Sequence, residues 1–189
     1  MTRGTLHLVV GPSGAGKDTL LAAAKTARPD ILFPSRVITR PAEAGGEPHV
    51  AVAAARFDAM ERAGAFILSW RAHGLAYGIP AEAGDALAAG RHVAVNVSRA
   101  VIDGARARLG PVRVLMVSAS PDVLARRLFA RGREDPGDIA ARLARAGAMA
   151  PQWPDSHLIM NDGAPEDGAA ALLAAMAPPL GATSGAGAC

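Results

Sequence analysis

The chain has 189 residues, of which 50% are hydrophobic, and a formal net charge of +3; this length fits one domain with a sizeable core. The single cysteine, Cys189, excludes an intrachain disulfide, which fits a reducing compartment, so we expect a cytoplasmic protein. Aromatic residues make up 4%, too few for a base-stacking platform, and no stretch approaches the ~20 apolar residues of a membrane helix, so neither a nucleic acid nor a membrane is expected as a partner.

Short apolar runs alternate with helical patterns along the chain. In chain order we expect a strand at 5–10, a helix at 18–27, a strand at 36–39, a short helix near 57–64, a strand at 65–70, a turn at 71–80, strands at 92–97 and 112–119, helices at 120–132 and 139–146, a strand at 157–160 and a helix at 166–176. Strands that alternate with helices predict an α/β fold with a parallel sheet covered on both faces.

The segment "GPSGAGKDTL" contains a nearly complete phosphate-binding pattern. It meets G-x-x-x-x-G-K-[ST] at Gly11, Gly16 and Lys17, then departs from it at Asp18, where a hydroxyl would meet magnesium. The segment follows an expected strand and opens an expected helix, so its backbone N–H groups can turn towards phosphate oxygens while Lys17 neutralises the transferring group. The alternative is a glycine-rich turn without a ligand. The residues expected to hold ATP here are Gly11, Pro12, Ser13, Gly14, Ala15, Gly16, Lys17, Asp18 and Thr19.

Three further regions have the form of one kinase family's motifs. They are "ITRPAEAGGE", "RLFARGRED" followed by "IAARLARA", and "IMND". With the loop, they make the chain from Leu6 to about Met176 similar to the guanylate-kinase-like nucleotide kinases. The resemblance implies a P-loop kinase domain at 1–177 with three α/β/α layers around a central parallel sheet. It also implies an acceptor-binding lobe inserted at about 35–80 and an Arg-rich lid at about 131–140. The low-complexity residues 178–189 are expected to be a disordered tail.

The departures from that family concern the base-reading residues. Guanylate kinases read the guanine edge with a Glu, a Ser and an Asp, whereas this chain has Leu68, Ile79 and Ser98 in those places. A site that loses its hydrogen-bonding groups loses discrimination of several orders of magnitude. A second Arg of the acceptor loop is also missing, since "RPAE" offers Ala42 and Glu43. We therefore expect an acceptor other than guanylate.

The same segments are similar to a narrower branch of the family, the ribose 1,5-bisphosphate phosphokinases of bacterial phosphonate degradation. The matching stretches are "GPSGAGKD", "ITRPAEAGGEPH", "LSWRAHGLAYG", "VNVSRA", "RGRE" and "NDG". The resemblance implies that ATP and ribose 1,5-bisphosphate give ADP and 5-phosphoribosyl 1-diphosphate. One alternative is a nucleoside monophosphate kinase of altered base choice. Another, of a different class, is a non-catalytic interaction domain, although Lys17 and the Arg-rich lid argue against it. The oligomeric state stays open, a homodimer included.

The resemblance also assigns roles to individual residues. A phosphate acceptor is already ionised near neutral pH, so catalysis reduces to alignment and charge neutralisation and needs no general base. The expected catalytic residues are Lys17 and the lid residues Arg131 and Arg142, with Arg133 beside them; a lid arginine could instead be a solvated helix residue. Arg40 matches the arginine that clamps the acceptor phosphate. Candidates for the second phosphate or the ribose hydroxyls are Arg36, His49, Arg71, His73 and Tyr77. Asn161 and Asp162 are expected beside the adenine; the alternative is an ordinary turn at the end of a strand.

Asp18 is the expected magnesium ligand. The strand at 92–97 ends where P-loop enzymes usually place an acidic residue that holds the ion, and here that position is Asn96. Magnesium prefers hard oxygen ligands and keeps several waters. Our hypothesis is that the negative charge has moved from the strand to the loop. The alternative is that Asp18 only favours the helix N-terminus.

Overall fold

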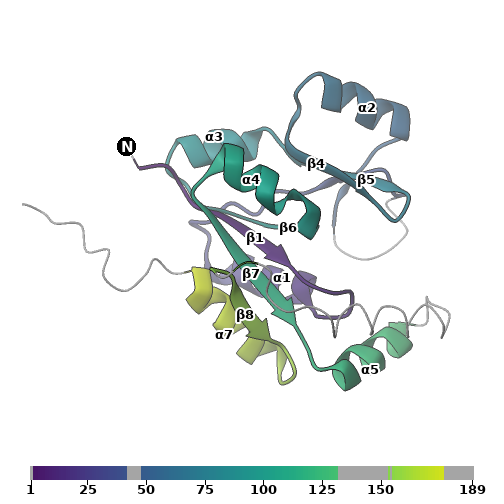
Figure 1. The fold of residues 1–189 in the computed structure, drawn as a ribbon, viewed down its shortest axis with the longest axis vertical. Coiled ribbons are helices and arrows are strands. Elements are labelled where there is room, and N and C mark those ends of the chain that lie inside the picture. The colour runs from purple at the N-terminus through teal and green to yellow at the C-terminus, as the bar shows by residue number, and fades with distance from the viewer. Residues whose placement is uncertain (1, 42–47, 132–152, 154, 177–189) are drawn as a thin grey trace, which may run out of the picture.

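A computed structural model of the chain describes residues 2–41, 48–131, 153 and 155–176 (Figure 1). Its central sheet consists of four parallel strands in the order β6-β1-β7-β8. These strands are β1 (Leu6–Val10), β6 (Val93–Asn96), β7 (Val112–Ser118) and β8 (His157–Met160). A single bridge from Leu32 to Val93 extends the sheet beyond β6. Every residue of β1 is buried, as expected for the middle of a parallel sheet.

Helices cover both faces of this sheet, which gives the expected three layers. On one face, Leu6, Leu8 and Val10 of β1 pack against α3 (Glu82–Ala88) and α4 (Ile102–Leu109). On the other face, Val9 packs against helices α1 (Lys17–Ala27), α5 (Pro121–Arg131) and α7 (Pro165–Met176). The alternation of β1 side chains between two cores therefore fixes the layer order.

A second, mixed sheet forms an inserted lobe between α1 and α3. Its strand order is β3-β2-β5-β4, with β2 and β3 parallel and the other pairs antiparallel. The strands are β2 (Val37–Ile38), β3 (Val50–Ala51), β4 (Phe66–Ala72) and β5 (Leu75–Pro80). Helix α2 (Ala54–Arg62) packs on this sheet through Phe57, whose ring stacks on Phe66 at 4.8 Å. The lobe thus has a small core of its own. Figure 1 shows the lobe beside the central sheet.

The expected turn at 71–80 is wrong. These residues complete β4, make a two-residue turn and form β5, so that Ala72 pairs with Leu75. The turn residues His73 and Gly74 have φ of 53° and 72°, as a hairpin turn that follows the strand twist requires. The small residues of this segment suggested a turn, but Gly78 is needed inside β5 because a Cβ there would lie 2.7 Å from the Phe66 ring.

The other expected elements mostly match the structure, within one or two residues at their ends. The helices α3 and α4 and the strand β3 were not expected, because their short, alanine- and glycine-rich sequences show little apolar periodicity. The expected helix at 139–146, most of the lid at 131–140 and the tail at 178–189 lie outside the described residues.

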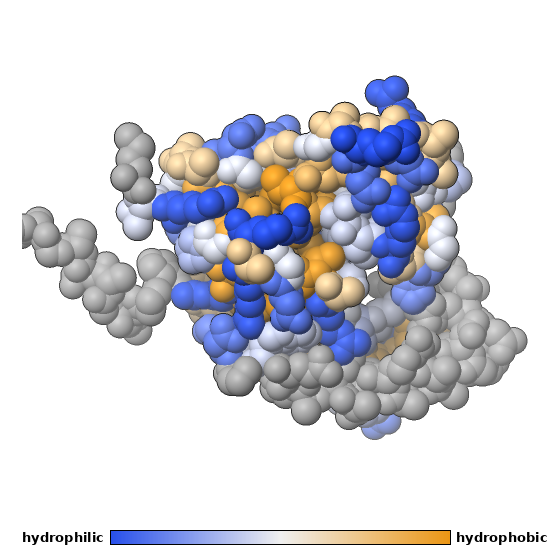
Figure 2. Space-filling view, turned by 45° about the horizontal axis from the view of Figure 1, so that its top comes forward, coloured by the Kyte–Doolittle hydropathy of each residue, from blue (hydrophilic) through white to orange (hydrophobic). Residues whose placement is uncertain are grey.

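On the face drawn in Figure 2, hydrophilic side chains surround apolar side chains that gather near the middle of the described part. None of the helices in the described part has the length and apolar character that crossing a membrane would require.

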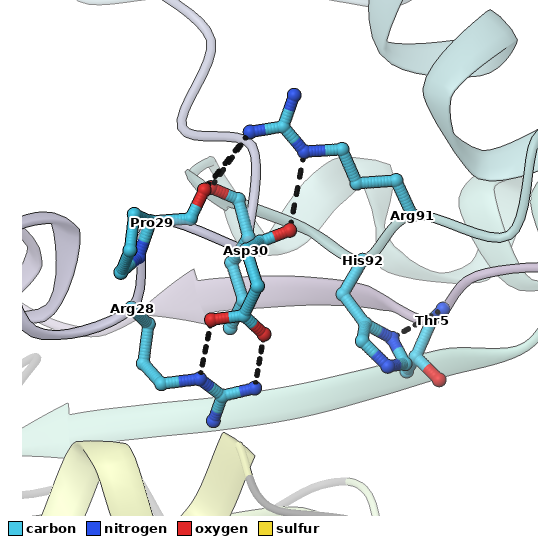
Figure 3. A network of polar contacts seen from close by, with 7 residues as sticks. Thr5, Arg28, Pro29, Asp30, Arg91 and His92 are labelled. Atoms are coloured by element: carbon cyan, nitrogen blue, oxygen red, sulfur yellow. Dashed lines mark hydrogen bonds and ion pairs between the residues drawn. The ribbon is translucent and has the colours of Figure 1, made fainter.

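At the end of the central sheet opposite the glycine loop, a polar network joins the segment after α1 to β6 (Figure 3). Arg28 makes two hydrogen bonds to the Asp30 carboxylate, at 2.8 and 2.7 Å. Arg91 donates to the carbonyls of Pro29 and Asp30, and the Thr5 N–H donates to Nδ1 of His92 at 2.9 Å. These contacts satisfy main-chain groups where the chain leaves α1 and returns to the sheet.

Candidate active site

The loop between β1 and α1 depends on glycine at both ends. Gly11 has φ 147°, and a Cβ there would collide with the carbonyl oxygen of Val117 on β7. Gly16 has φ 89° and caps α1, and a Cβ there would lie 2.5 Å from Nδ2 of Asn161. The chain can therefore curl tightly around the N-terminus of α1, which is the arrangement that binds phosphates.

Lys17, the first residue of α1, folds back over this loop. Its Nζ donates to the carbonyl oxygens of Gly11 and Pro12, each at 2.9 Å. The ammonium group is thereby held at the mouth of the loop, where a bound phosphate would meet it.

Asp18 and Asn96 lie in direct contact. Nδ2 of Asn96, at the end of β6, donates to Oδ1 of Asp18 at 2.8 Å. The two positions that the sequence linked are therefore neighbours in space. Their side-chain oxygens are the hard ligands that magnesium prefers, and so they fit this ion. The described residues contain no group of three or more His, Cys, Asp or Glu side chains that could hold a metal; magnesium that is also bound by substrate phosphates needs no such group.

A cavity of about 390 Å³ opens between the loop and the inserted lobe. Its described lining includes four cationic side chains and no carboxylate. The cations are Lys17, Arg36, Arg40 and Arg99. The wall formed by the lobe consists of Trp70, Ala72, His73 and Tyr77. This charge pattern suits a ligand with more than one phosphate group.

Arg36 is held between the two sheets. Its Nη1 donates to the main-chain carbonyl of Asn96 at 3.2 Å, and its guanidinium carbon lies 5.5 Å from the centre of the Tyr77 ring. The Tyr77 ring in turn stacks on Trp70, with centroids 5.2 Å apart and planes tilted by 4°. The face of the Tyr77 ring thus stabilises the Arg36 cation and helps to hold it in the cavity.

Arg40 is positioned by His49. Nη2 of Arg40 lies 3.4 Å from Nδ1 of His49, and Nε2 of His49 lies 3.1 Å from the carbonyl oxygen of Arg40. His49 itself does not line the cavity. Nε of Arg40 is buried and has no hydrogen-bond partner within the described structure. Because Arg40 also lines the cavity, its guanidinium is placed where it can meet an anionic ligand.

Arg71, by contrast, is not brought into the cavity. It alternates with Trp70 and Ala72 along β4 and so faces away, towards α2. There its Nη2 lies 2.9 Å from Asp58 and 2.7 Å from Glu61. The hydrogen bond from Arg71 lowers the pKa of Glu61 to about 2. The structure therefore gives Arg71 a role on the outer face of the lobe.

Asn161 lies beneath the loop. Its side chain is 4% exposed, and its Nδ2 donates to the carbonyl of Ala15 at 2.8 Å. A buried amide in this position supports the loop from below, whereas the sequence suggested an open contact with adenine. The next residue, Asp162, accepts a hydrogen bond from the N–H of Ser120 at 2.6 Å. The end of β8 therefore braces both the loop and the start of α5.

The sequence interpretation did not single out Arg99 and Arg127. Arg99 lines the cavity, and Nη1 of Arg127 on α5 is buried beside the loop, without a hydrogen-bond partner in the described part of the chain. Both lie in segments that were quoted as motifs, but nothing in a single sequence separates them from surface arginines. For the lid residues, Arg131 ends α5, while Arg133 and Arg142 lie outside the described residues.

Comparison with known proteins places the chain in a family, although no family model matches it. A protein of Chromobacterium violaceum named ribose 1,5-bisphosphate phosphokinase PhnN is 50% identical over 162 residues, which is 85% of this chain and 87% of the relative. The chain belongs to the PhnN family. A family member from Methylobacterium radiotolerans with the same name is 48% identical over 174 residues, covering 90% of this chain and 96% of the relative. The resemblance inferred from the motifs is thus confirmed.

A solved structure confirms the fold. Guanylate kinase from Anaplasma phagocytophilum superposes with a TM-score of 0.67 at 19% identity, covering 93% of this chain and 85% of that protein. At this identity the similarity concerns the fold alone. The PhnN-family chain therefore has the guanylate-kinase-like α/β/α architecture that its motifs implied.

Proposed function

We propose that the chain transfers the γ-phosphoryl group of ATP to ribose 1,5-bisphosphate, giving ADP and 5-phosphoribosyl 1-diphosphate. The observation that carries this proposal is the cavity with four cations and no carboxylate among its described lining residues. Each phosphate monoester has a charge of about −1.5 to −2 at pH 7, so a bisphosphate matches this lining. The names of the relatives support the same reaction.

The base-reading positions support a sugar acceptor over a nucleotide. Leu68 and Ile79 are 2% and 0% exposed and belong to the core of the domain. The Ser98 hydroxyl accepts a hydrogen bond from the N–H of Ala100 at 3.4 Å and so caps the turn after β6. Ser98 still brings a hydroxyl to the cavity, but none of the three offers the carboxylate that would recognise a guanine edge.

The donor side works through the loop. Its N–H groups and the N-terminus of α1 bind the ATP phosphates, and Lys17 exchanges its carbonyl partners on Gly11 and Pro12 for phosphate oxygens. An oxygen of the acceptor phosphate at C1 forms a bond to the γ-phosphorus while the bond from that phosphorus to the bridging oxygen of ADP breaks. The attacking oxygen is already ionised, so no side chain has to remove a proton.

On the acceptor side, Arg40 clamps the reacting phosphate. Its place in the cavity lining and its contact with His49 suit this role. Arg36 adds a second cation beside Tyr77. Together with Lys17, these side chains offset the repulsion between two phosphate groups that are brought into contact.

Magnesium would be held on the donor side by Asp18, directly or through water, with Asn96 keeping the carboxylate in place. The ion would neutralise part of the charge on the β- and γ-phosphates. Without it, a carboxylate at ~4 Å would repel those phosphates by roughly 1 to 4 kcal/mol, so we propose that Asp18 restricts binding to the metal complex of ATP.

The test is a panel of acceptors with ATP and magnesium, with each product identified by mass. We expect ribose 1,5-bisphosphate to gain one phosphoryl group and GMP to be at best a very poor acceptor. A comparable kcat/KM for GMP would overturn the proposal in favour of a nucleoside monophosphate kinase. Absence of turnover with every acceptor would favour a non-catalytic interaction domain.

A further inference from the structure

Arg99 also lines the cavity, and the proposed reaction gives it no function. It begins the 3-10 turn η2 (Arg99–Val101), directly after β6, and this turn lies against β4 of the lobe. The main chain between Asn96 and Arg99 is fixed, because the N–H of Val97 bonds to the carbonyl of Val9 and Ser98 caps the turn. The position of Arg99 at the cavity is therefore built into the end of the central sheet.

Arg99 lines the cavity without a carboxylate partner among the described residues. Arg28, Arg71 and Arg106 are each paired with a carboxylate. The Arg99 side chain makes no hydrogen bond or ion pair with any residue that the structure describes, and the described cavity lining offers it three further cations and no carboxylate. Four like charges around one cavity repel one another unless an anion binds among them.

The two phosphates of the acceptor need separate cations. The sugar ring holds them apart, so only one of them can meet Lys17 and the loop. Arg36 already bonds to the Asn96 carbonyl, and Arg40 is held by His49. Arg99 differs because none of its guanidinium nitrogens bonds to a residue within the described ranges. It lies on the turn beside the lobe, three residues beyond the Asn96 that contacts Asp18. A guanidinium fork binds a phosphate through two parallel hydrogen bonds.

We propose that Arg99 binds the phosphate at C5 of the acceptor, the one that does not receive the phosphoryl group, and so selects a sugar bisphosphate over a sugar 1-phosphate. This inference rests on the proposed function. The contact is made before and during the transfer, and therefore contributes to binding more than to the chemical step.

The first test measures equilibrium binding without ATP, by calorimetry, for ribose 1,5-bisphosphate, ribose 5-phosphate and ribose 1-phosphate. Arg99→Gln should weaken the first two by about 10- to 100-fold, the range of one charge-assisted contact, and leave the third unchanged. Arg108→Gln is the matched control, because Arg108 is exposed on the neighbouring α4 and, among the described residues, its side chain bonds to Gly104 of its own helix. Equal losses for all three ligands, or no loss, would overturn the inference.

The second test separates this site from the reaction itself. In turnover with ribose 1,5-bisphosphate, Arg99→Gln should raise KM with little change in kcat, and Arg99→Lys should recover part of the loss. If the wild type binds ribose 5-phosphate through Arg99 but never phosphorylates the bisphosphate, the proposed function fails and the subsite stands. If turnover is normal and Arg99→Gln binds ribose 5-phosphate like the wild type, the subsite fails and the function stands.

Discussion

At the scale of single residues, the contact between Asp18 and Asn96 is where this phosphate loop differs from the usual pattern. The hydroxyl that usually follows the loop lysine is replaced by a carboxylate, and the acid expected at the end of β6 is replaced by an amide that donates to it. One negative charge is kept within the pair. Since the pair spans α1 and β6, the metal site that we propose would join the loop to the central sheet.

Replacing Asp18 by Asn tests this exchange of charge. We expect Asp18→Asn to raise the magnesium concentration required for half-maximal rate and to lower kcat, while metal-free ATP binds as well as before or better, because the repulsion on the phosphates is gone. Rates measured over a magnesium titration and ATP binding measured with a chelator check both parts.

Two further variants sharpen this test. Asp122→Asn removes a first-turn carboxylate from α5 and controls for a general effect on helix starts. In the double variant Asp18→Asn with Asn96→Asp, the carboxylate returns to the strand, and the magnesium requirement should move back towards that of the wild type. Normal turnover of Asp18→Asn at limiting magnesium would leave Asp18 as a helix-start residue only.

A second prediction at the scale of single residues concerns His7 and the pH dependence of the free energy of unfolding. Its side chain is 1% exposed on β1, and neither ring nitrogen has a hydrogen-bond partner within the described residues. Burial, assisted by the nearby charges of His92, Arg113 and Arg28, lowers the pKa of His7 to about 3. The unfolded chain takes up a proton near pH 6.5, whereas the folded chain does not, so stability is complete above that pH and falls as the pH is lowered.

We expect this one histidine to cost about 2 kcal/mol of unfolding free energy between pH 7 and pH 5. His7→Leu, which keeps the site apolar and filled, should remove that share of the pH dependence. Urea unfolding at the two pH values measures this difference in the free energy of unfolding. His157→Gln, at an exposed position of β8, is the control. An unchanged difference between pH 7 and pH 5 in His7→Leu would show that other groups cause it.

At the scale of elements, the loop is shaped by contacts from strands that are distant in sequence. β7 approaches Gly11 from one side, and Asn161 at the end of β8 bonds to Ala15 from below. The loop is thus held in the form that binds phosphates, without a ligand present. Such preorganisation lowers the entropic cost of binding.

The role of Asn161 can be decided with two ligands. If it supports the loop, Asn161→Ala should weaken the binding of ATP and of inorganic tripolyphosphate alike, by about 5- to 10-fold for one lost hydrogen bond. If it contacts adenine, only ATP binding should suffer. Calorimetry with both ligands checks this, and Asp167→Ala, in the exposed first turn of the neighbouring α7, is the control.

At the scale of the whole molecule, the active site is assembled between two sheets. The central sheet supplies the loop, Asn96 and Arg99, whereas the lobe supplies Arg36, Arg40 and the aromatic pair of Trp70 and Tyr77. The bond from Arg36 to the Asn96 carbonyl and the packing of η2 on β4 join these two parts. The residues proposed for the donor and for the acceptor therefore come mainly from different sheets, and they meet at the cavity.

Local patterns were sufficient to predict the central sheet and the loop. The apolar runs that became β1, β6 and β7 are buried on both faces, and burial on both faces is visible in composition alone. The glycine spacing and Lys17 identified the phosphate loop because the backbone conformation that they permit is itself local. The motif set also identified the kinase family, which the relatives confirm.

Only the tertiary structure decided which charged residues face the ligand. Arg71 and Arg99 are indistinguishable in sequence, yet strand alternation turns Arg71 towards the carboxylates of α2, and the turn after β6 brings Arg99 to the cavity. Asn161 likewise lies under the loop because β8 pairs with β7, a contact between segments about forty residues apart. The sequence by itself determined the chemistry that is available to this protein. The pairing of distant strands determined where each group lies, because the direction of a side chain depends on the neighbours that its strand acquires in the fold.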